Sequence, residues 1–265
     1  MFIKMKQKLI LASVALLMMS CSAGTYYQVV DVKSSNLQKE SNNYVYNDGV
    51  CKIVYNFWAE GGDAGFLIEN HSDEVIYVDL GNTFFIMNGM ANNYGVGMNT
   101  KIVVEPSTNV ASVEKNALAI PPHASKIISE YRIMEDVIQD CSVNLKVKRN
   151  QPQGMTYAET ESPIVFRNYI TYRTDKNVTE PKVIVNDFYV SGYSNYLSTD
   201  IIKGKASGCK GTVTKSYNDK YKADRFYVKY DKTHVNNYSA DAETASKVTL
   251  NDAYYSVKKN KQIIE

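Results

Sequence analysis

Four consecutive residues, His71, Ser72, Asp73 and Glu74, have the side-chain types of a hydrolase triad. A triad needs a base that contacts the nucleophile on one side and an orienting acid on the other. Neighbours within one turn do not reach that geometry, and the alternating runs "FLIEN" and "VIYVDL" on either side favour a hairpin turn. The sequence therefore predicts no catalytic residue and no enzymatic activity.

Residues that could ligate a metal are equally sparse. Glu60 and Asp63 flank Gly61-Gly62 and have the oxygen ligands of a calcium loop, but two glycines with acidic neighbours are also ordinary turn chemistry, and EF-hand spacing is absent. The chain has three histidines, with neither a CxxC nor an HxxxH motif. The stretch "GKASGCKGT" at 204–212 lacks the GxxxxGK[ST] spacing of a phosphate loop. We expect no metal and no cofactor.

The segment "FRNYITYR" carries the best candidate for a binding surface. In a strand, Arg167, Tyr169, Thr171 and Arg173 share one face, and same-face neighbours lie about 6.6 Å apart. Arg167 can then lie along Tyr169, and guanidinium groups suit an anionic sugar or a phosphate. The alternative is an outer sheet face whose arginines point into water.

Aromatic residues add a second candidate. Trp58, the only tryptophan, sits at a predicted strand end, where an exposed indole would bind a sugar and a buried one would belong to the rim of the core. The predicted ligand-binding residues are thus Trp58, Arg167, Tyr169 and Arg173. The 21 tyrosines against 8 phenylalanines favour half-exposed sheet surface, because tyrosine joins an apolar body to a polar tip.

Three cysteines follow residue 21, and an odd number leaves at most one disulfide and one unpaired thiol in an oxidising compartment. Cys51 alternates with Ile53 and Tyr55 and is expected to face the core, where a thiol behaves as a small hydrophobe. Cys141 and Cys209 lie in polar, turn-like surroundings, "QDCSV" and "SGCKG". They are the preferred disulfide pair.

Short alternating runs separated by turn residues fill the chain from Tyr44 onward. They predict an all-β fold, a two-sheet immunoglobulin-like β-sandwich over residues 44–238 with little helix. Asn88-Gly89 between apolar residues is a strong hairpin signal. "RIMEDVIQD" at 132–140 is the best helical candidate. Residues 239–265 are expected to form a tail that carries at most a short helix.

The N-terminus has the layout of a secretory signal. Lys4, Lys6 and Lys8 precede a mostly apolar run, Leu9 to Met19, which is too short for a membrane-spanning helix of about 20 residues. We expect residues 1–20 to be removed and residues 21–43 to form an anchor and a polar tether. Loss of the three lysines lowers Lys+Arg from 30 to 27 against 28 Asp+Glu. The net charge of −1 argues against nucleic acid.

The stretch "LLMMSCSAG" resembles the lipobox of bacterial lipoproteins, with Ser20 before the cysteine that becomes the lipidated N-terminus, Cys21. By this resemblance, Ser22 after the cysteine implies the outer membrane. The following "SAGTYYQ" lacks the acidic run of exported lipoproteins, which favours the periplasmic leaflet over the cell surface. The membrane is then a partner through the N-terminal lipid.

The strand motifs "SPIVFRNYITY", "VNDFYVSGYSNY" and "RFYVKY" behind such a leader resemble predicted envelope lipoproteins of unknown function from Bacteroides-type gut bacteria. The resemblance implies an envelope location and carries over no functional residue. We therefore expect non-catalytic binding to, or assembly with, an envelope protein. The alternative is a lipoprotein that binds a glycan or an anionic ligand, and a hydrolase ranks third.

Overall fold

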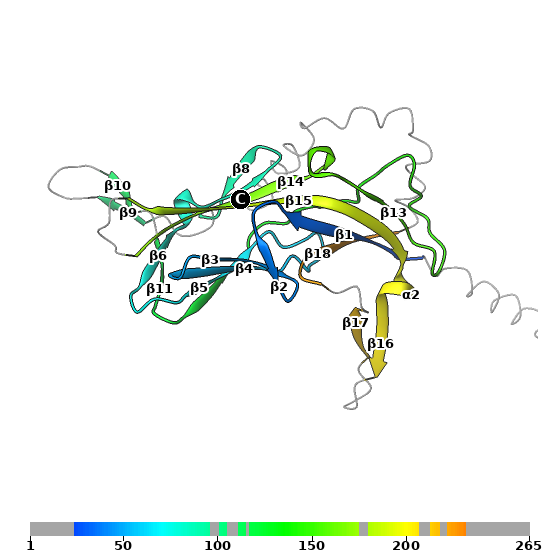
Figure 1. Ribbon diagram of the computed structural model, residues 1–265, viewed down its shortest axis with the longest axis horizontal. Helices are drawn as coiled ribbons and strands as arrows, with labels where there is room; N and C mark the ends of the chain where they lie inside the picture. Colours follow the sequence, from blue (N-terminus) through cyan, green and yellow to red (C-terminus); the bar gives the residue numbers. More distant parts are fainter. Residues whose placement is uncertain are drawn as a thin grey trace, which may run out of the picture. The chain divides into compact units, whose positions relative to one another are not determined.

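Antiparallel strands dominate the computed structural model, which describes residues 24–95, 101–104, 111–114, 117–174, 180–206, 213–217 and 222–231 (Figure 1). The described strands belong to one unit, Thr25–Tyr230. Helix is limited there to α2 (Ser198–Ile201) and two 3-10 turns, η1 (Leu80–Asn82) and η2 (Glu159–Glu161). The prediction of an all-β sandwich with little helix is confirmed.

The larger sheet has nine strands. Its main path runs in the order β11 (Ala117–Ile120), β6 (Ile76–Asp79), β14 (Val165–Arg173), β15 (Lys182–Leu197), β1 (Tyr26–Ser34) and β18 (Arg225–Tyr230). Off this path, β7 (Phe84–Met87) pairs with β14, β8 (Met90–Asn93) with β7, and β13 (Gln153–Thr156) with β15.

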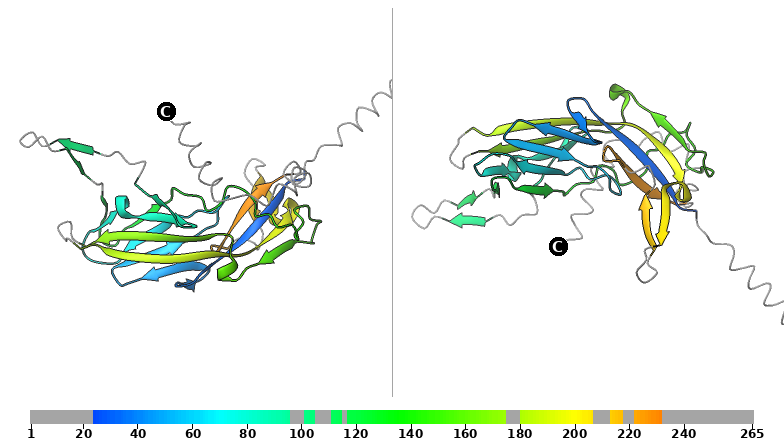
Figure 2. Two further views of the ribbon diagram at one scale, coloured as in Figure 1. Left: turned by 90° about the horizontal axis from the view of Figure 1, so that it is seen from above. Right: turned by 60° about the horizontal axis from the view of Figure 1, so that its bottom comes forward.

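The smaller sheet has five strands and forms the second layer (Figure 1 and Figure 2). Its order is β12 (Ser125–Ile128), β5 (Phe66–Asn70), β4 (Cys51–Tyr55), β3 (Asn43–Asn47) and β2 (Gln38–Glu40). Two separate hairpins complete the described strands, β9 (Lys101–Val104) with β10 (Ala111–Glu114) and β16 (Ile202–Ala206) with β17 (Val213–Tyr217).

Aromatic rings join the two sheets. Phe166 and Phe188, from neighbouring strands of the larger sheet, stack with ring centroids 5.2 Å apart. Tyr55 of β4 meets Phe188 edge to face at 4.8 Å, and Phe57 meets Phe166 at 5.6 Å. Edge-to-face pairs of this kind add to the free energy of burial. The core is therefore an aromatic cluster between β4 and the β14–β15 pair.

Many tyrosines lie in this interior rather than on half-exposed sheet surface, so the surface interpretation of the tyrosine excess was wrong for them. The buried tyrosines are Tyr26, Tyr27, Tyr44, Tyr55, Tyr94, Tyr172, Tyr193, Tyr227 and Tyr230. Several hydroxyls have buried partners: Tyr94 donates to Asn168 Oδ1 over 2.7 Å, and Asn186 Nδ2 donates to the Tyr55 oxygen over 2.7 Å. Polar partners inside the sandwich let tyrosine serve as a core residue.

The N-terminal tether was placed incorrectly. Residues 26–34 form β1, which lies between β15 and β18 in the larger sheet, and residues 38–40 form β2. Residues 26–30 are all buried, so this strand lacks the alternation that reveals a half-buried strand. The sandwich therefore begins near Tyr26 instead of Tyr44. The leader, Cys21 and residues 232–265 lie outside the described residues.

The expected helix at 132–140 is also absent: this stretch has no regular structure. A buried glutamine of β1 fixes it instead. Gln28 Nε2 donates to Ile138 O over 2.9 Å and to Asn195 Oδ1 over 3.0 Å, and Ile138 N donates to Gln28 Oε1 over 2.7 Å. A side chain that bonds both backbone groups of Ile138 replaces the hydrogen bonds that a helix would have made.

Replacing Gln28 with alanine is expected to destabilise the domain by about 3 kcal/mol, because Ile138 N–H and Asn195 Oδ1 lose their buried partner. The free energy of unfolding from urea titration measures the effect. Gln38→Ala is the matched control, since Gln38 is exposed on β2 and should change stability by less than about 0.5 kcal/mol. Equal effects of the two substitutions would contradict this role of Gln28.

Cys51 faces the core as predicted and is fully buried. Burial raises the pKa of its thiol to about 12. At about pH 8 only about one thiol in ten thousand is then ionised, and the thiolate is the reactive form. We expect iodoacetamide to leave Cys51 unmodified in the folded protein and to alkylate it in urea, as read by mass spectrometry of the Cys51 peptide. Equal labelling rates in the two states would show that the thiol is accessible.

Candidate functional site

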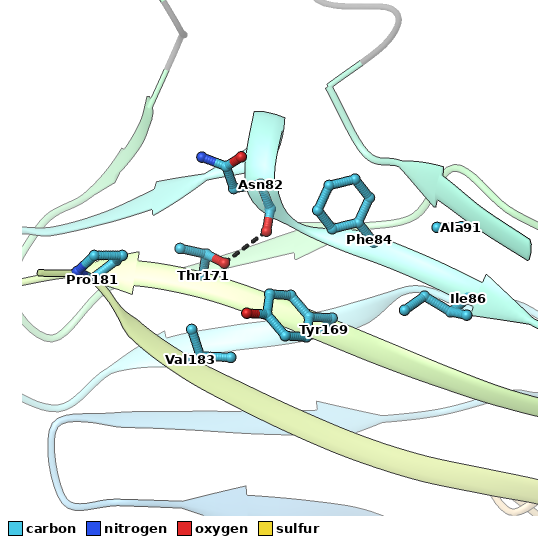
Figure 3. A pocket seen from close by; sticks show the side chains of 8 residues that line it. All are labelled: Asn82, Phe84, Ile86, Ala91, Tyr169, Thr171, Pro181 and Val183. Atoms are coloured by element: carbon cyan, nitrogen blue, oxygen red, sulfur yellow. Dashed lines mark hydrogen bonds between the residues drawn. The ribbon is translucent and has the colours of Figure 1, made fainter. Parts of the chain in front are cut away.

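An apolar hollow lies on the outer face of the larger sheet, with a cavity volume of about 460 Å³ (Figure 3). Its wall combines side chains of β7, β8, β14 and β15 with the residues after β6 and before β15. The lining residues are Asn82, Phe84, Ile86, Ala91, Tyr169, Thr171, Pro181 and Val183. We call this set the outer-face concavity.

Strand alternation places these side chains on the outer face. In β14, Phe166, Asn168 and Ile170 are buried in the sandwich, so Tyr169 and Thr171 must point the other way. Tyr169 lies opposite Phe84 of β7 and Thr171 opposite Val183 of β15. The predicted shared face of Arg167, Tyr169, Thr171 and Arg173 follows from the same alternation.

The hairpin that supplies Phe84, Ile86 and Ala91 turns at Asn88-Gly89, as predicted. Asn88 has φ 47° and Gly89 has φ 86°, the pair of positive values that a type I′ turn requires. The turn is attached to β14, since Asn88 Oδ1 accepts from Val165 N over 2.9 Å. The turn end of this concavity wall is therefore held in register with β14.

Two polar side chains of the wall bond within the protein. Thr171 Oγ1 donates to Asn82 O over 2.7 Å, and Asn82 Nδ2 donates to Asp79 Oδ2 over 2.7 Å. The rings of Phe84 and Tyr169 lie 6.3 Å apart at 57° and border the opening (Figure 3). A ligand in this hollow therefore meets mainly aromatic and aliphatic carbon.

The two predicted arginines are paired with carboxylates. Arg167 Nε donates to Asp187 Oδ1, and this hydrogen bond raises the pKa of Arg167. Arg173 Nη2 lies 3.9 Å from Asp79 Oδ2. Neither side chain is among the residues that line the concavity. The paired carboxylates offset the positive charge that an anionic ligand would require.

Trp58 does not join Tyr169 in one platform. Its indole lies half-buried against Tyr227, with ring centroids 5.2 Å apart, beside a cluster of Tyr27, Val29 and Ile201. Along β15, the residue paired with Val29 is Ser194, whereas the residue paired with Tyr169 is Val185. Nine residues of strand separate these positions by about 30 Å, so one small ligand cannot contact both.

The remaining candidates have structural partners. His71 Nε2 lies 3.2 Å from Glu69 Oε2, whereas Ser72 Oγ donates to Asn70 Oδ1 over 2.7 Å, as expected of a turn rather than a triad. Asp63 accepts from Gly65 N, which is turn chemistry, and from Ser129 Oγ, which is a tertiary contact. Within the described ranges, no group of three or more His, Cys, Asp or Glu is arranged to hold a metal ion.

The preferred disulfide stays a prediction. Cys141 is exposed in the irregular segment after Asp140, and Cys209 lies outside the described residues. The lipid-anchor cysteine, Cys21, lies outside them as well.

The fold and the concavity define a two-sheet β-sandwich with an apolar hollow on the outer face of one sheet. No protein-family model matches the chain, no curated protein matches it, and no solved structure matches it. Among the described residues, no helix is long and apolar enough to cross a membrane.

Of the residues that line the concavity, the sequence indicated only Tyr169 and Thr171 as members of an outer strand face. One signal was available: in "TFFIMNGMA" apolar residues occupy both faces of a hairpin, although a sheet with one solvated face should alternate with polar residues. Phe84 and Ile86 on the outer face break that rule. The sequence did not indicate Val183 and Pro181 as lining residues. Their position near β7 depends on β14 pairing with both β7 and β15.

Asp79, which pairs with Arg173, and Asp187, which pairs with Arg167, should differ in how much they stabilise the fold. Asp79 is 6% exposed and accepts from both the backbone and the side chain of Asn82, so Asp79→Asn should cost about 2 kcal/mol of stability. Asp187 holds Arg167 at the surface, and Asp187→Asn should cost less than about 1 kcal/mol. Urea titrations of both variants measure the difference, and the reverse order would contradict the assignment.

Proposed function

We propose that this chain is a lipid-anchored protein of the cell envelope that acts by non-catalytic binding to an envelope protein. The outer-face concavity is the binding site in this proposal. Residues 1–20 direct export, and acylated Cys21 attaches the sandwich to the outer membrane, with the periplasmic leaflet favoured. These two features rest on the leader sequence and its resemblance to a lipobox.

The observation that carries the proposal is an apolar hollow on the sheet face that points away from the smaller sheet. Val183 is 44% exposed within the concavity, and Val165, on the same face of β14, is 42% exposed. Apolar side chains scattered singly on a surface need no explanation, but a group around a hollow marks an interaction site. Burial of this group by a partner would remove it from water, which is favourable.

The chemistry of the wall favours an apolar partner surface. Specific protein interfaces have an apolar core with aromatic anchors and a polar rim. Phe84, Tyr169, Ile86 and Val183 supply such a core, and the ion-paired Arg167 lies outside it. A partner protein that presents aliphatic or aromatic side chains fits this arrangement.

A glycan-binding lipoprotein is the alternative, and the half-exposed rings of Phe84 and Tyr169 favour it because sugars pack their apolar faces against aromatic rings. Against it, Trp58 lies far along the sheet, and both arginines are paired with carboxylates. The two proposals differ in their ligand but share the site.

Site-specific photo-cross-linking tests the proposed site. We expect p-benzoylphenylalanine at Tyr169 to form one defined adduct with an envelope protein in cells that produce the full chain. Tyr46 of β3, which is also half-buried and lies in the smaller sheet, is the matched control position and should give no such adduct. Adducts of equal yield at both positions, or at neither, would contradict a binding site in the concavity.

Acylation tests the anchor separately. The full chain should incorporate a labelled fatty acid and fractionate with membranes, and Cys21→Ser should lose both properties. Removal of the domain by protease from intact cells would place it at the cell surface, whereas protection until lysis would place it in the periplasm. A wild-type chain without incorporated fatty acid would overturn the lipoprotein assignment and leave the binding site untouched.

A further inference from the structure

The concavity ends at a sheet edge. Ala91, which lines it (Figure 3), belongs to β8, and among the described residues β8 pairs only with β7. Ala91 is exposed. An apolar hollow and an open strand edge therefore meet at one residue, and each is a feature that a partner can use.

The register shows which backbone groups point outward at this edge. Asn88 N donates to Val165 O over 2.9 Å, so Asn88 directs its backbone toward β14. Successive residues alternate in direction, and Met87 therefore bonds across the hairpin to Met90, the residue opposite it. Ala91 is the next residue of β8, and its N–H and C=O point away from β7.

The edge is short, which limits how it can be used. Asn93, two residues farther on, also points outward, but its carbonyl accepts a hydrogen bond from the Tyr131 hydroxyl. An added strand would thus find its main-chain partners around Ala91. Backbone pairing alone would be weak there, so a side chain in the concavity must supply much of the affinity.

We infer that the partner binds as an extended peptide segment that adds a strand to the edge of β8 and places a large apolar side chain in the outer-face concavity. This inference rests on the proposed function and names the form of its ligand. In strand addition, main-chain hydrogen bonds give affinity, and hollows for alternate side chains give specificity.

The geometry of sheets supports this arrangement. A strand added to β8 lies about 4.8 Å from it, and a residue opposite Ala91 projects from the same sheet face as Ala91. Ala91 has only a methyl group, whereas Ile86, the residue opposite it on β7, and Tyr169, which also lines the concavity, are large. The small residue at the edge leaves room for a large side chain from the added strand.

The lining favours this ligand over a sugar or an anion. Among the described residues no charged side chain lines the concavity, and Thr171 Oγ1 and Asn82 Nδ2 already donate to protein oxygens. A sugar would bury hydroxyls against carbon there, which costs free energy unless each is hydrogen-bonded. A peptide strand brings its polar groups to the edge and its apolar side chain to the hollow.

Titration of the folded domain with synthetic hexapeptides tests the inference. The probes alternate threonine with phenylalanine, leucine or valine, and amide shifts of isotopically labelled protein report the site. We expect at least one probe to shift Ala91 and Tyr169 at about 1 mM or below. N-methylation of its edge-facing amides should weaken binding about tenfold or more, because the hydrogen bonds are lost while the side chains remain.

A variant of the edge provides the reciprocal test. Ala91→Pro removes the outward N–H, a change that an edge strand tolerates, and should weaken binding of the unmodified peptide about tenfold. Ala91→Ser keeps the N–H and is the matched control, with binding within about twofold of the wild type. If Ala91→Pro does not fold, as judged by circular dichroism, the N-methylated peptide decides alone.

The outcomes separate this inference from the proposed function. Peptides that shift Tyr169 and bind equally well after N-methylation would overturn strand addition and leave the binding site in place. Shifts at Tyr169 caused by maltohexaose or decanoate, with none from any peptide, would overturn the peptide ligand. The inference is also contradicted if no peptide shifts any amide of the protein at about 1 mM. The photo-cross-link at Tyr169 tests the proposed function independently.

Discussion

The pairing of one long strand, β15, holds the larger sheet together. It has 16 residues and pairs with β1 over Phe188–Leu197 along one side. Along the other side it pairs first with β14, over Lys182–Tyr189, and then with β13, over Gly192–Asn195. The change of partner coincides with a register shift at Asp31/Val32 of β1. Every other strand of this sheet is positioned through β1 or β14.

Close backbone approach makes the second pairing depend on glycine. A Cβ at Gly192 would lie 2.6 Å from Met155 O, and one at Gly154 would lie 1.9 Å from Tyr193 O. Contacts this short exclude any larger residue unless β13 moves away. Main-chain contact with β15 therefore sets the position of β13 and of the irregular segment before it, which Gln28 anchors.

The same strand organises the function proposed for the chain. On its inner face, Ile184, Asn186 and Phe188 join the core, and on its outer face Val183 lines the concavity and Asp187 neutralises Arg167. The sheet thus separates an aromatic interior from an apolar outer hollow. The hollow continues to β8, which among the described strands pairs only with β7, and there the proposed peptide would extend the sheet.

The sequence by itself determined the strands that are buried on one face and the turns between them. Alternation in "CKIVY" and "FLIEN" and the Asn88-Gly89 turn are local properties, because strand direction and turn type depend on neighbouring residues. They also fixed the burial of Cys51 and the outward direction of Tyr169. Only the tertiary structure decided that β1 is a central strand, since burial on both faces removes its alternation. It also decided that Trp58 and Tyr169 lie apart and that Phe84, Ile86 and Val183 surround one hollow, because these positions depend on strand order and register.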